Sequence, residues 1–520
     1  MAPPQRCDVL VAGSGNAGFS AAVAAKQAGA KHVVLIDKCP EEWAGGNTYF
    51  TAGAYRTVHG GISDLLPLVN NVDDATAKRI DLEPYTNDDF SKDMKRVCSG
   101  RSDPRLSKIL IEESNATVKW LKSNGIQFQL SFNRQAYEVD GRLKFWGGLH
   151  IKTEDGGKGL IEDHKAAAKN HGVEVIYSAA LKRLIPDSQT GAVTSVEVQS
   201  NGREAVIETG AVILAAGGFE SNPRMRSQYL GPGWDLAKVR GTPHNTGDVL
   251  ETAIRDLSAA QAGNWSGCHS VAWDANAPSD TGDREASNEF TKSGYPLGLM
   301  FNILGQRFVD EGIDLRNYTY AKFGRAILAQ PGHVAYQVWD SQTSSWLRSE
   351  EYRPERVERI SADSIEELAE KLTAYGLENK DAFVRNIKEY NDAVYAFQKE
   401  NPDKKWDPAV RDGMSTQSST TRLPLGKTNW ALPLDKGPFL AVAVTCGITF
   451  TFGGLKVNPE TAQVISSATG KEVPGVYAVG EMLGGLFYEN YPGGSGLTSG
   501  AVFGRRAGTA AAKAVAGATR

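Results

Sequence analysis

The stretch CDVLVAGSGNAGFSAAVAAKQAGAKHVVLID, residues 7–37, decides the fold. Apolar residues 7–12 predict a short buried strand, and the six residues after it have the GxGxxG spacing. An alanine-rich run then predicts a helix, and KHVVLID predicts a second strand. This order of strand, glycine turn, helix and strand is the unit that binds the pyrophosphate of a dinucleotide.

Each position of the glycine turn has a physical role. Gly13 permits the tight turn, Gly15 lets the backbone approach a pyrophosphate, and Gly18 lets helix and strand pack closely. Asn16 and Ala17 stand where the helix opens, and a helix N-terminus offers free N–H groups and a partial positive charge to phosphates. These five residues are therefore predicted cofactor contacts.

The end of the second strand extends the same site. Asp37 stands where an acidic residue accepts a hydrogen bond from the adenosine ribose, and Lys38 follows it. The strand, the helix, the second strand and the terminal acid are in register, which favours dinucleotide binding over an ordinary glycine turn.

Two later segments favour FAD over NAD. Residues 193–209 predict a hairpin with an Asn-Gly turn, which leads into the apolar strand of AVILAAGGF. PGVYAVGEMLGG predicts a further strand near the end of the chain. The chain thus returns to its first sheet after a long excursion, an arrangement more typical of large flavoproteins than of simple NAD dehydrogenases. The predicted cofactor contacts at these two strand ends are Ala216, Gly217, Gly480 and Glu481.

Composition excludes several other classes of protein. A chain of 520 residues is too long for one compact core, and a net charge of −4 gives no sign of nucleic-acid or anionic-membrane binding. No apolar run is long enough to span a bilayer, and MAPPQR leaves no room for a signal peptide, so we expect a cytoplasmic protein. The five cysteines contain no CxxC pair, so we predict buried free thiols and no metal site.

The long segment between the two parts of the predicted nucleotide-binding fold, from about residue 267 to 448, has a different composition. It is rich in Trp, Tyr and Asn. It contains a predicted helical pair. Ser364 and Glu367 form a capping box at the start of the first helix. The apolar faces of the two helices comprise Ile365, Leu368 and Leu372, and then Phe383, Ile387, Tyr390 and Val394.

Several motifs together resemble one known family. They are GSGNAG, the GGNT of residues 45–48, AAGGF, NTGDVL, GQRFVDE and the C-terminal YPGGSGLTSGAVFGRRAG. The combination resembles the fumarate reductase and succinate dehydrogenase flavoprotein superfamily from about residue 7 to 512. Within it, GNWSGCH, DEGIDLRNYTYAKFG and ENYPGGSGLTSG look most like the tricarballylate dehydrogenase branch.

The resemblance implies an α/β fold with two domains. A Rossmann-like FAD-binding domain of the glutathione-reductase type would comprise residues 1–268 and 449–520. An inserted α+β capping domain, residues 269–448, would close over the flavin and hold the substrate against it.

The resemblance also implies noncovalent FAD, because no histidine stands near GGNT in the setting of a covalent linkage and His59, the nearest, lies in a predicted loop. Glu481 would bind the ribityl region. Further implied contacts are Gly46, Asn47 and Thr48 near the flavin ring, and Ser495, Gly496, Leu497 and Thr498 in the C-terminal loop.

The implied reaction is hydride transfer between a substrate carbon and flavin N5, coupled to proton transfer at the adjacent carbon. Arg316 matches the catalytic arginine of the family, and His269 matches the histidine that holds a substrate carboxylate. Charge patterning alone favours a surface ion pair for Arg316, with Asp310, Glu311 or Asp314, and a lone histidine is more often structural.

Three departures from the family make simple fumarate reduction unexpected. TFTFGG at residues 449–454 has no histidine, Tyr491 stands in Asn-Tyr-Pro where an arginine is expected, and SGYPLGLMFN replaces the loop of the proton relay. The leading hypothesis is dehydrogenation of a tricarballylate-like polycarboxylate, at a CH–CH bond next to a carboxylate, to a conjugated alkene.

The alternatives come from other classes of function. Tyr491, with Tyr318 or Tyr320 on the cap, also resembles the tyrosines of 3-ketosteroid dehydrogenases, which gives an ene-reductase or Δ1-dehydrogenase of an apolar ketone. A flavin-binding protein without catalysis is a third possibility. The electron acceptor is expected to be a separate protein or oxygen, since no cluster ligands are present.

Overall fold

A mostly parallel sheet forms the nucleotide-binding lobe of this computed structural model, which describes residues 3–278, 281–286 and 288–518. Its strand order is β10-β11-β12-β1-β2-β9, with β20 beside β12 and β19 beside β20. The strands are β1 (Arg6–Ala12), β2 (Val33–Ile36), β9 (Glu174–Ile176), β10 (Ala179–Pro186), β11 (Val193–Ser200), β12 (Arg203–Leu214), β19 (Gln463–Ile465) and β20 (Glu472–Ala478).

The sequence predictions for this lobe are confirmed. β11 and β12 form the antiparallel hairpin with its turn at Asn201-Gly202. β12 lies parallel to β1, and β20 lies parallel to the end of β12, so the C-terminal segment does return to the first sheet. The fold is mixed α/β, as expected.

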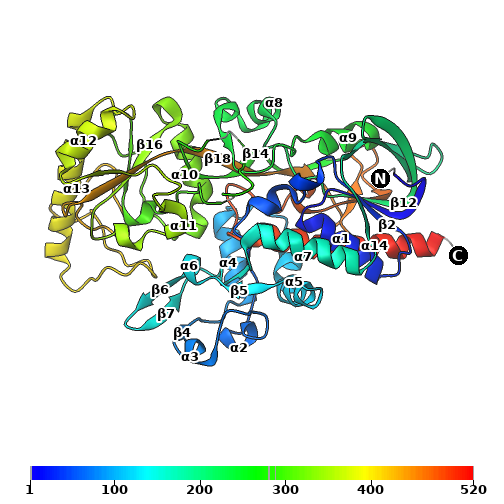
Figure 1. The fold of residues 1–520 in the computed structure, drawn as a ribbon, viewed down its shortest axis with the longest axis horizontal. Coiled ribbons are helices and arrows are strands. Elements are labelled where there is room, and N and C mark those ends of the chain that lie inside the picture. Colours follow the sequence, from blue (N-terminus) through cyan, green and yellow to red (C-terminus); the bar gives the residue numbers. More distant parts are fainter. Residues whose placement is uncertain (1–2, 279–280, 287, 519–520) are drawn as a thin grey trace.

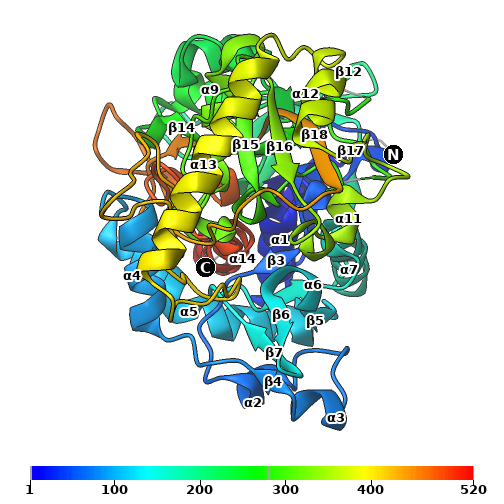
Figure 2. The same cartoon turned by 90° about the vertical axis from the view of Figure 1, so that its left-hand side faces the viewer.

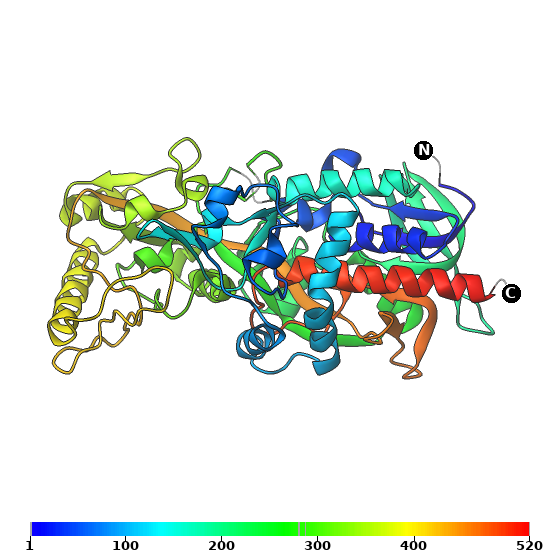
Figure 3. The ribbon, with the colours of Figure 1, turned by 90° about the horizontal axis from the view of Figure 1, so that it is seen from below.

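Two helices with small side chains lie side by side against this sheet (Figures 1 and 3). They are α1 (Asn16–Gln27), at the predicted position, and the C-terminal α14 (Ser495–Ala518). Their backbones approach so closely that a Cβ on Gly508 would lie 2.1 Å from the Ala21 carbonyl oxygen. This packing brings the loop before α14 next to the glycine turn before α1.

A second sheet forms the other lobe, and two long strands join the lobes. β14 (Gln261–Asp274) and β18 (Phe439–Leu455) pair antiparallel along most of their length, and Figure 3 shows β18 in orange running between the lobes. The proposed boundaries, after residues 268 and 448, both fall inside these strands. The remaining strands are β13 (Lys238–Val239), β15 (Leu299–Asn302), β16 (Ala335–Trp339) and β17 (Ile360–Ala362).

The predicted helical pair covers this second sheet. α12 (Ile365–Thr373) begins at Ser364, whose side chain accepts from the Glu367 N–H, and α13 (Lys380–Glu400) follows. Figure 2 shows α13 lying across β15 and β16. The predicted apolar faces pack on Leu299, Phe301, Tyr336 and Val338 of these strands, forming a core separate from that of the first lobe.

A third region, between β2 and β9, carries small sheets and most of the remaining helices. Its strands are β3 (Ala54–Tyr55), β4 (Ile80–Asp81), β5 (Phe128–Leu130), β6 (Ala136–Val139), β7 (Arg142–Phe145) and β8 (Ile151–Thr153). Its helices are α2 (Ile62–Leu65), α3 (Asp74–Ala77), α4 (Asn87–Val97), α5 (Pro104–Ser123), α6 (Phe132–Gln135) and α7 (Gly156–Asn170). The other helices are α8 (Pro223–Met225), α9 (Asp248–Leu257), α10 (Tyr320–Leu328) and α11 (Ser349–Tyr352).

The cysteines match their prediction, since all five are buried and free. None of the helices in the described residues is long and apolar enough to cross a membrane. The described part of the chain also holds no cluster of three His, Cys, Asp or Glu side chains arranged to bind a metal ion.

Candidate active site

One elongated cavity runs from the carboxyl ends of β1 and β2 to the cap. It encloses 1720 Å³ free of protein atoms, part of it open to solvent. Its lining joins the glycine turn and the loop before α14 to residues of the cap, so a cofactor and a substrate would share one continuous site. All predicted cofactor contacts except Gly18, Ser495 and Thr498 line it.

The glycine turn forms one end of the cavity. Gly13 has φ +115°, and a Cβ on it would lie 2.2 Å from the Ala215 carbonyl oxygen. A Cβ on Gly18 would lie 1.9 Å from the Gly13 carbonyl oxygen, so Gly18 serves packing. A Cβ on Gly15 would meet nothing closer than 3.5 Å and would instead occupy the cavity, which leaves the backbone open to a phosphate.

Asp37 and Lys38 lie beside this turn. Asp37 accepts hydrogen bonds from the Ser14 backbone N–H and hydroxyl, both at 2.7 Å, so it fixes the turn as well as lining the cavity. The Lys38 ammonium is engaged by Asp248 at 2.6 Å. The charge of Lys38 is thus balanced within the protein.

Asn16 joins the two segments that were predicted to contact the cofactor. Its Nδ2 donates to the Leu497 carbonyl at 2.8 Å, and its backbone N–H donates to Thr48 Oγ1 at 3.1 Å. Ser495 and Thr498 turn their hydroxyls to backbone carbonyls, of Pro492 and Arg56, and so shape the loop without lining the cavity.

Asn47 and Glu481 are tied to a third residue, Glu220, which sequence reasoning missed. Glu220 is fully buried, and its Oε1 accepts from the side-chain amides of Asn47 and Asn245. Glu481 Oε1 accepts from the Thr451 backbone N–H at 2.6 Å. Burial raises the pKa of Glu481 to about 7, although hydrogen bonds from Glu220 and Thr451 act to lower it. The only sequence signal for Glu220 is an acidic residue directly after the apolar strand and its AAGGF turn.

The cap end of the cavity gathers His269, Tyr320 and Tyr491. His269 lies on β14 at a break in its pairing with β18, and such a bulge re-aims a side chain. The His269 ring packs edge-on against Tyr320 and Tyr491, with ring centres 5.9 and 4.8 Å away. Burial lowers the pKa of His269 to about 3, so the ring is neutral at pH 7, and its Nδ1 has no partner among the described residues.

Arg240, also missed by sequence reasoning, stands beside this group. It follows β13, is 8% exposed and lines the cavity. Its guanidinium donates to Thr449 Oγ1 at 3.2 Å and to Asn288 Oδ1, and no Asp or Glu of the described residues forms an ion pair with it. Burial lowers the pKa of Arg240 to about 10, which still leaves it charged at pH 7. The one sequence feature that could have indicated Arg240 is that no Asp or Glu lies within four residues of it.

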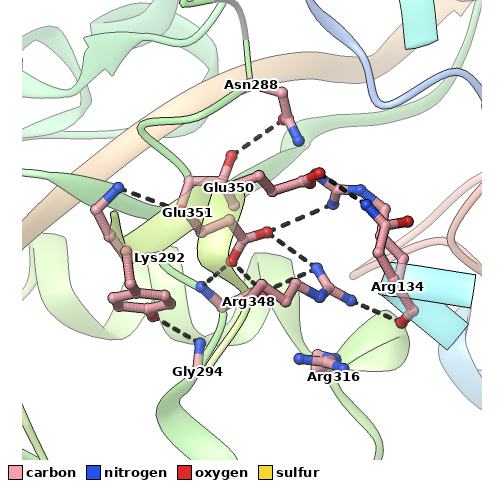
Figure 4. Close-up of polar contacts among 12 residues, drawn as sticks. Arg134, Asn288, Lys292, Gly294, Arg316, Arg348, Glu350 and Glu351 are labelled. Atoms are coloured by element: carbon pink, nitrogen blue, oxygen red, sulfur yellow. Dashed lines mark hydrogen bonds and ion pairs between the residues drawn. The ribbon is translucent and has the colours of Figure 1, made fainter. Parts of the chain in front are cut away.

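Arg134, at the end of α6, is the second arginine on the cavity wall, but its charge is balanced. Figure 4 shows Arg134 and Arg348 pointing at the carboxylates of Glu350 and Glu351 on α11. Burial alone would raise the pKa of Glu351, yet Arg348 and Arg134 hold it at about 2. This ion-pair cluster joins the third region to the cap across the cavity.

Arg316 lies apart from the cavity wall. It is buried, donates to the Tyr137 hydroxyl at 3.0 Å, and lines a smaller hollow with Trp146 and Trp430. Figure 4 shows it beyond Arg348, without a contact to the cluster. The predicted surface ion pairs of Arg316 with Asp310, Glu311 or Asp314 are absent from the described contacts. Tyr318 is also turned away, with its hydroxyl on Asp93 at 2.7 Å.

The residues present fit FAD. A cradle of glycines leads into the N-terminus of α1, and backbone from three distant segments, around residues 15, 46 and 496, surrounds the same space. FAD contacts would come from the glycine turn, Asp37, the 46–48 segment, Glu481 and the loop before α14. The substrate would then lie between this cofactor and Arg240, His269, Tyr320 and Tyr491.

Comparison with known proteins agrees with this geometry. A probable fumarate reductase of Shewanella frigidimarina (strain NCIMB 400) is 27% identical over 511 residues, covering 98% of this chain and 76% of the relative. The open conformation of a flavocytochrome c3 fumarate reductase superimposes with a TM-score of 0.72 at 25% identity, covering 99% of this chain and 79% of that chain.

A 3-ketosteroid Δ1-dehydrogenase from Sterolibacterium denitrificans has the same fold, with a TM-score of 0.72 at 19% identity, and 98% and 100% of the two chains covered. The family model described as FAD binding domain matches residues 8–497. The protein is an FAD-dependent oxidoreductase acting on CH–CH or C=C bonds, and it belongs to this FAD-binding family, within the fumarate reductase and succinate dehydrogenase flavoprotein superfamily.

Proposed function

We propose that the protein oxidises a CH–CH bond next to a carboxylate, and that Arg240 holds this carboxylate. The observation that carries the proposal is the unbalanced charge of Arg240 on the wall of the cavity. A buried charge is costly unless it is paired. A substrate carboxylate would supply the missing partner through a two-pronged hydrogen bond.

The cap residues divide the remaining tasks. FAD, when bound, accepts a hydride at N5. The neutral His269, with an unpartnered Nδ1, orients a polar group of the substrate. Tyr320 or Tyr491 handles the proton at the adjacent carbon, since both line the cavity beside His269. The ion-pair cluster of Arg134 and Glu351 keeps the cap closed and water out.

A tricarballylate-like polycarboxylate, oxidised to a conjugated alkene, is the substrate that the sequence motifs favour. Arg240 would hold one of its carboxylates, and Arg134, which is ion-paired with Glu350 and Glu351, lies on the same cavity wall. Arg316 was predicted to contact substrate, and its place outside the cavity wall favours Arg240 for this role. The acceptor of the electrons is proposed to be a separate protein or oxygen.

Dehydrogenation or reduction next to a ketone is the second candidate, and one observation favours it. Two tyrosines and a neutral histidine stand together at the cavity, with Phe450 and Val271 as apolar neighbours. Such hydroxyls suit a carbonyl oxygen. Arg240 is the feature that this candidate leaves without a role.

The test is an anaerobic titration that follows the flavin absorbance during addition of tricarballylate, succinate or a 3-ketosteroid. Bleaching by a carboxylate, lost in Arg240→Gln and kept in Arg316→Gln, supports the proposal. Arg316→Gln is the matched control, because it removes a buried arginine outside the cavity wall. If only the steroid bleaches the flavin, and Arg240→Gln does not change this bleaching, the second candidate function is supported and the first is refuted.

A further inference from the structure

Glu220 and Glu481 form a pair of carboxyl groups that the reaction proposed above does not use. Glu220 follows β12 and is fully buried, whereas Glu481 follows β20 and lines the cavity. Glu481 Oε1 lies against the backbone two residues before Glu220, since a Cβ on Gly218 would meet it at 2.1 Å, and the two carboxyl groups interact electrostatically. Parallel pairing of β12 with β20 is what brings these distant residues together.

The surroundings of Glu220 are neutral donors. Its Oε1 accepts from the amides of Asn47 and Asn245, while Oε2 receives no donor from the described residues. Arg226 Nη1 donates at 2.7 Å to the backbone carbonyl of Glu220 rather than to its carboxyl. Within the described part of the chain, therefore, no ion pair compensates Glu220.

Glu481 is held in a similar way. Its Oε1 accepts from the backbone N–H and the hydroxyl of Thr451, at 2.6 and 2.9 Å. The ionisable side chain that interacts with it is Glu220. Two adjacent carboxyl groups in such a place cannot both ionise, so they titrate as one unit that shares a proton. With Glu220 as the donor, Oε2 finds its missing partner.

We propose that the Glu220–Glu481 pair takes up a second proton when the bound flavin is reduced. Reduction of a bound flavin by two electrons and one proton would add one negative charge to the cavity that Glu481 lines. Uptake of one proton by the Glu481 carboxylate neutralises that charge. The flavin would then take the hydride from the CH–CH bond, and the carboxyl pair would take up one proton, so the cavity gains no net charge.

Glu220 is a positioning residue in this scheme. It keeps one proton on the pair and anchors Asn47, which lines the cavity and also donates to the Thr449 carbonyl. Burial and Glu481 raise the pKa of Glu220 well above its usual value, which favours its protonated form. Glu481 is then the group whose protonation changes when the flavin is reduced.

The decisive experiment is the midpoint potential of the substrate-free holoenzyme between pH 7 and 9. For a two-electron couple each proton contributes about 30 mV per pH unit. We expect a slope near 60 mV in the wild type within this range and near 30 mV in Glu220→Gln. The glutamine keeps the acceptor for both amides and donates an N–H to Glu481, so the carboxylate stays ionised.

Two controls make the outcome decisive. Asp256→Asn removes a mostly buried carboxylate at the far end of α9, ion-paired with Arg255, and should keep the wild-type slope. Infrared difference spectra of the wild type at pH 8 should gain a protonated-carboxyl band on reduction, which tests the proposal even if Glu220→Gln does not fold. A slope near 30 mV in the wild type, or reduction without that band, would overturn it.

Discussion

Replacing Arg240 by methionine should make the protein more stable and inactive at the same time. The guanidinium is nine-tenths buried and lacks a carboxylate partner among the described residues. Its unpaired charge is a cost that folding alone does not justify. Sites that sacrifice stability in this way are typical of binding and catalysis.

The magnitude follows from the contacts that Arg240 makes. Removing a buried ion from water costs several kcal/mol, and two hydrogen bonds to a charged group recover about 1.5–3 kcal/mol each. After the substitution, Asn288 Oδ1 still accepts from the Thr291 hydroxyl at 3.1 Å, and Thr449 faces the open cavity. No buried acceptor is orphaned, so we expect a net gain of about 1–3 kcal/mol.

Urea denaturation with FAD in excess measures this gain, because saturating cofactor holds its contribution to stability constant. Loss of an interaction with a buried substrate charge should raise KM or abolish turnover, by about 2–5 kcal/mol of binding free energy. A variant that is destabilised by more than about 1 kcal/mol would show that Arg240 is a structural residue. Full activity in a stable variant would equally refute its role.

Three further outcomes are expected. Gly13→Ala should lower stability, because its Cβ would clash at 2.2 Å, whereas Gly15→Ala should fold and bind FAD weakly; unfolding curves and flavin content separate the two. Glu351→Gln should cost about 3–5 kcal/mol at pH 7. The pKa of Glu351 in the folded protein is about 2, below its pKa in the unfolded chain. The stability that the ionised Glu351 contributes is therefore complete above the unfolded-state pKa and is lost as the pH falls toward 2. The melting temperatures of wild type and variant should converge in acid. A polycarboxylate should bind more tightly at lower pH, where it carries fewer charges, whereas a monocarboxylate should show no such gain in its Kd between pH 8 and 6; equal profiles for both would contradict the charge count at Arg240.

The nucleotide-binding half was predictable because its signals are local. The glycine spacing, the alternation of apolar residues and the Asn-Gly turn each determine a neighbouring strand or helix, as in β11 and β12. The return of β20 to the first sheet was predictable for a similar reason, since an apolar strand ending in Gly480-Glu481 has few other places to pair.

The substrate end was less accessible because its residues come from separate segments. Arg134 lies on α6 and Arg240 follows β13, so no spacing rule links them. Their difference is also invisible in sequence: Arg134 meets acids more than 200 positions away, at Glu350 and Glu351, and Arg240 meets no acid among the residues that the structure describes. Only the folded chain separates a balanced arginine from a free one.

The same charge balance bears on what the site accepts. Where the family pattern has a histidine pair and an arginine, the cavity here presents Thr449, Phe450 and Tyr491, which are neutral. Among the described basic residues that line the cavity, Lys38 and Arg134 are ion-paired and Arg240 has no acidic partner. A second carboxylate must compete with Glu350 and Glu351 for Arg134 or enter protonated, since a closed cavity raises the cost of every unpaired charge. The departures from the family pattern and the unpaired Arg240 thus fit the proposed substrate site, in which Arg240 would anchor one carboxylate and the rest of the substrate would meet tyrosines.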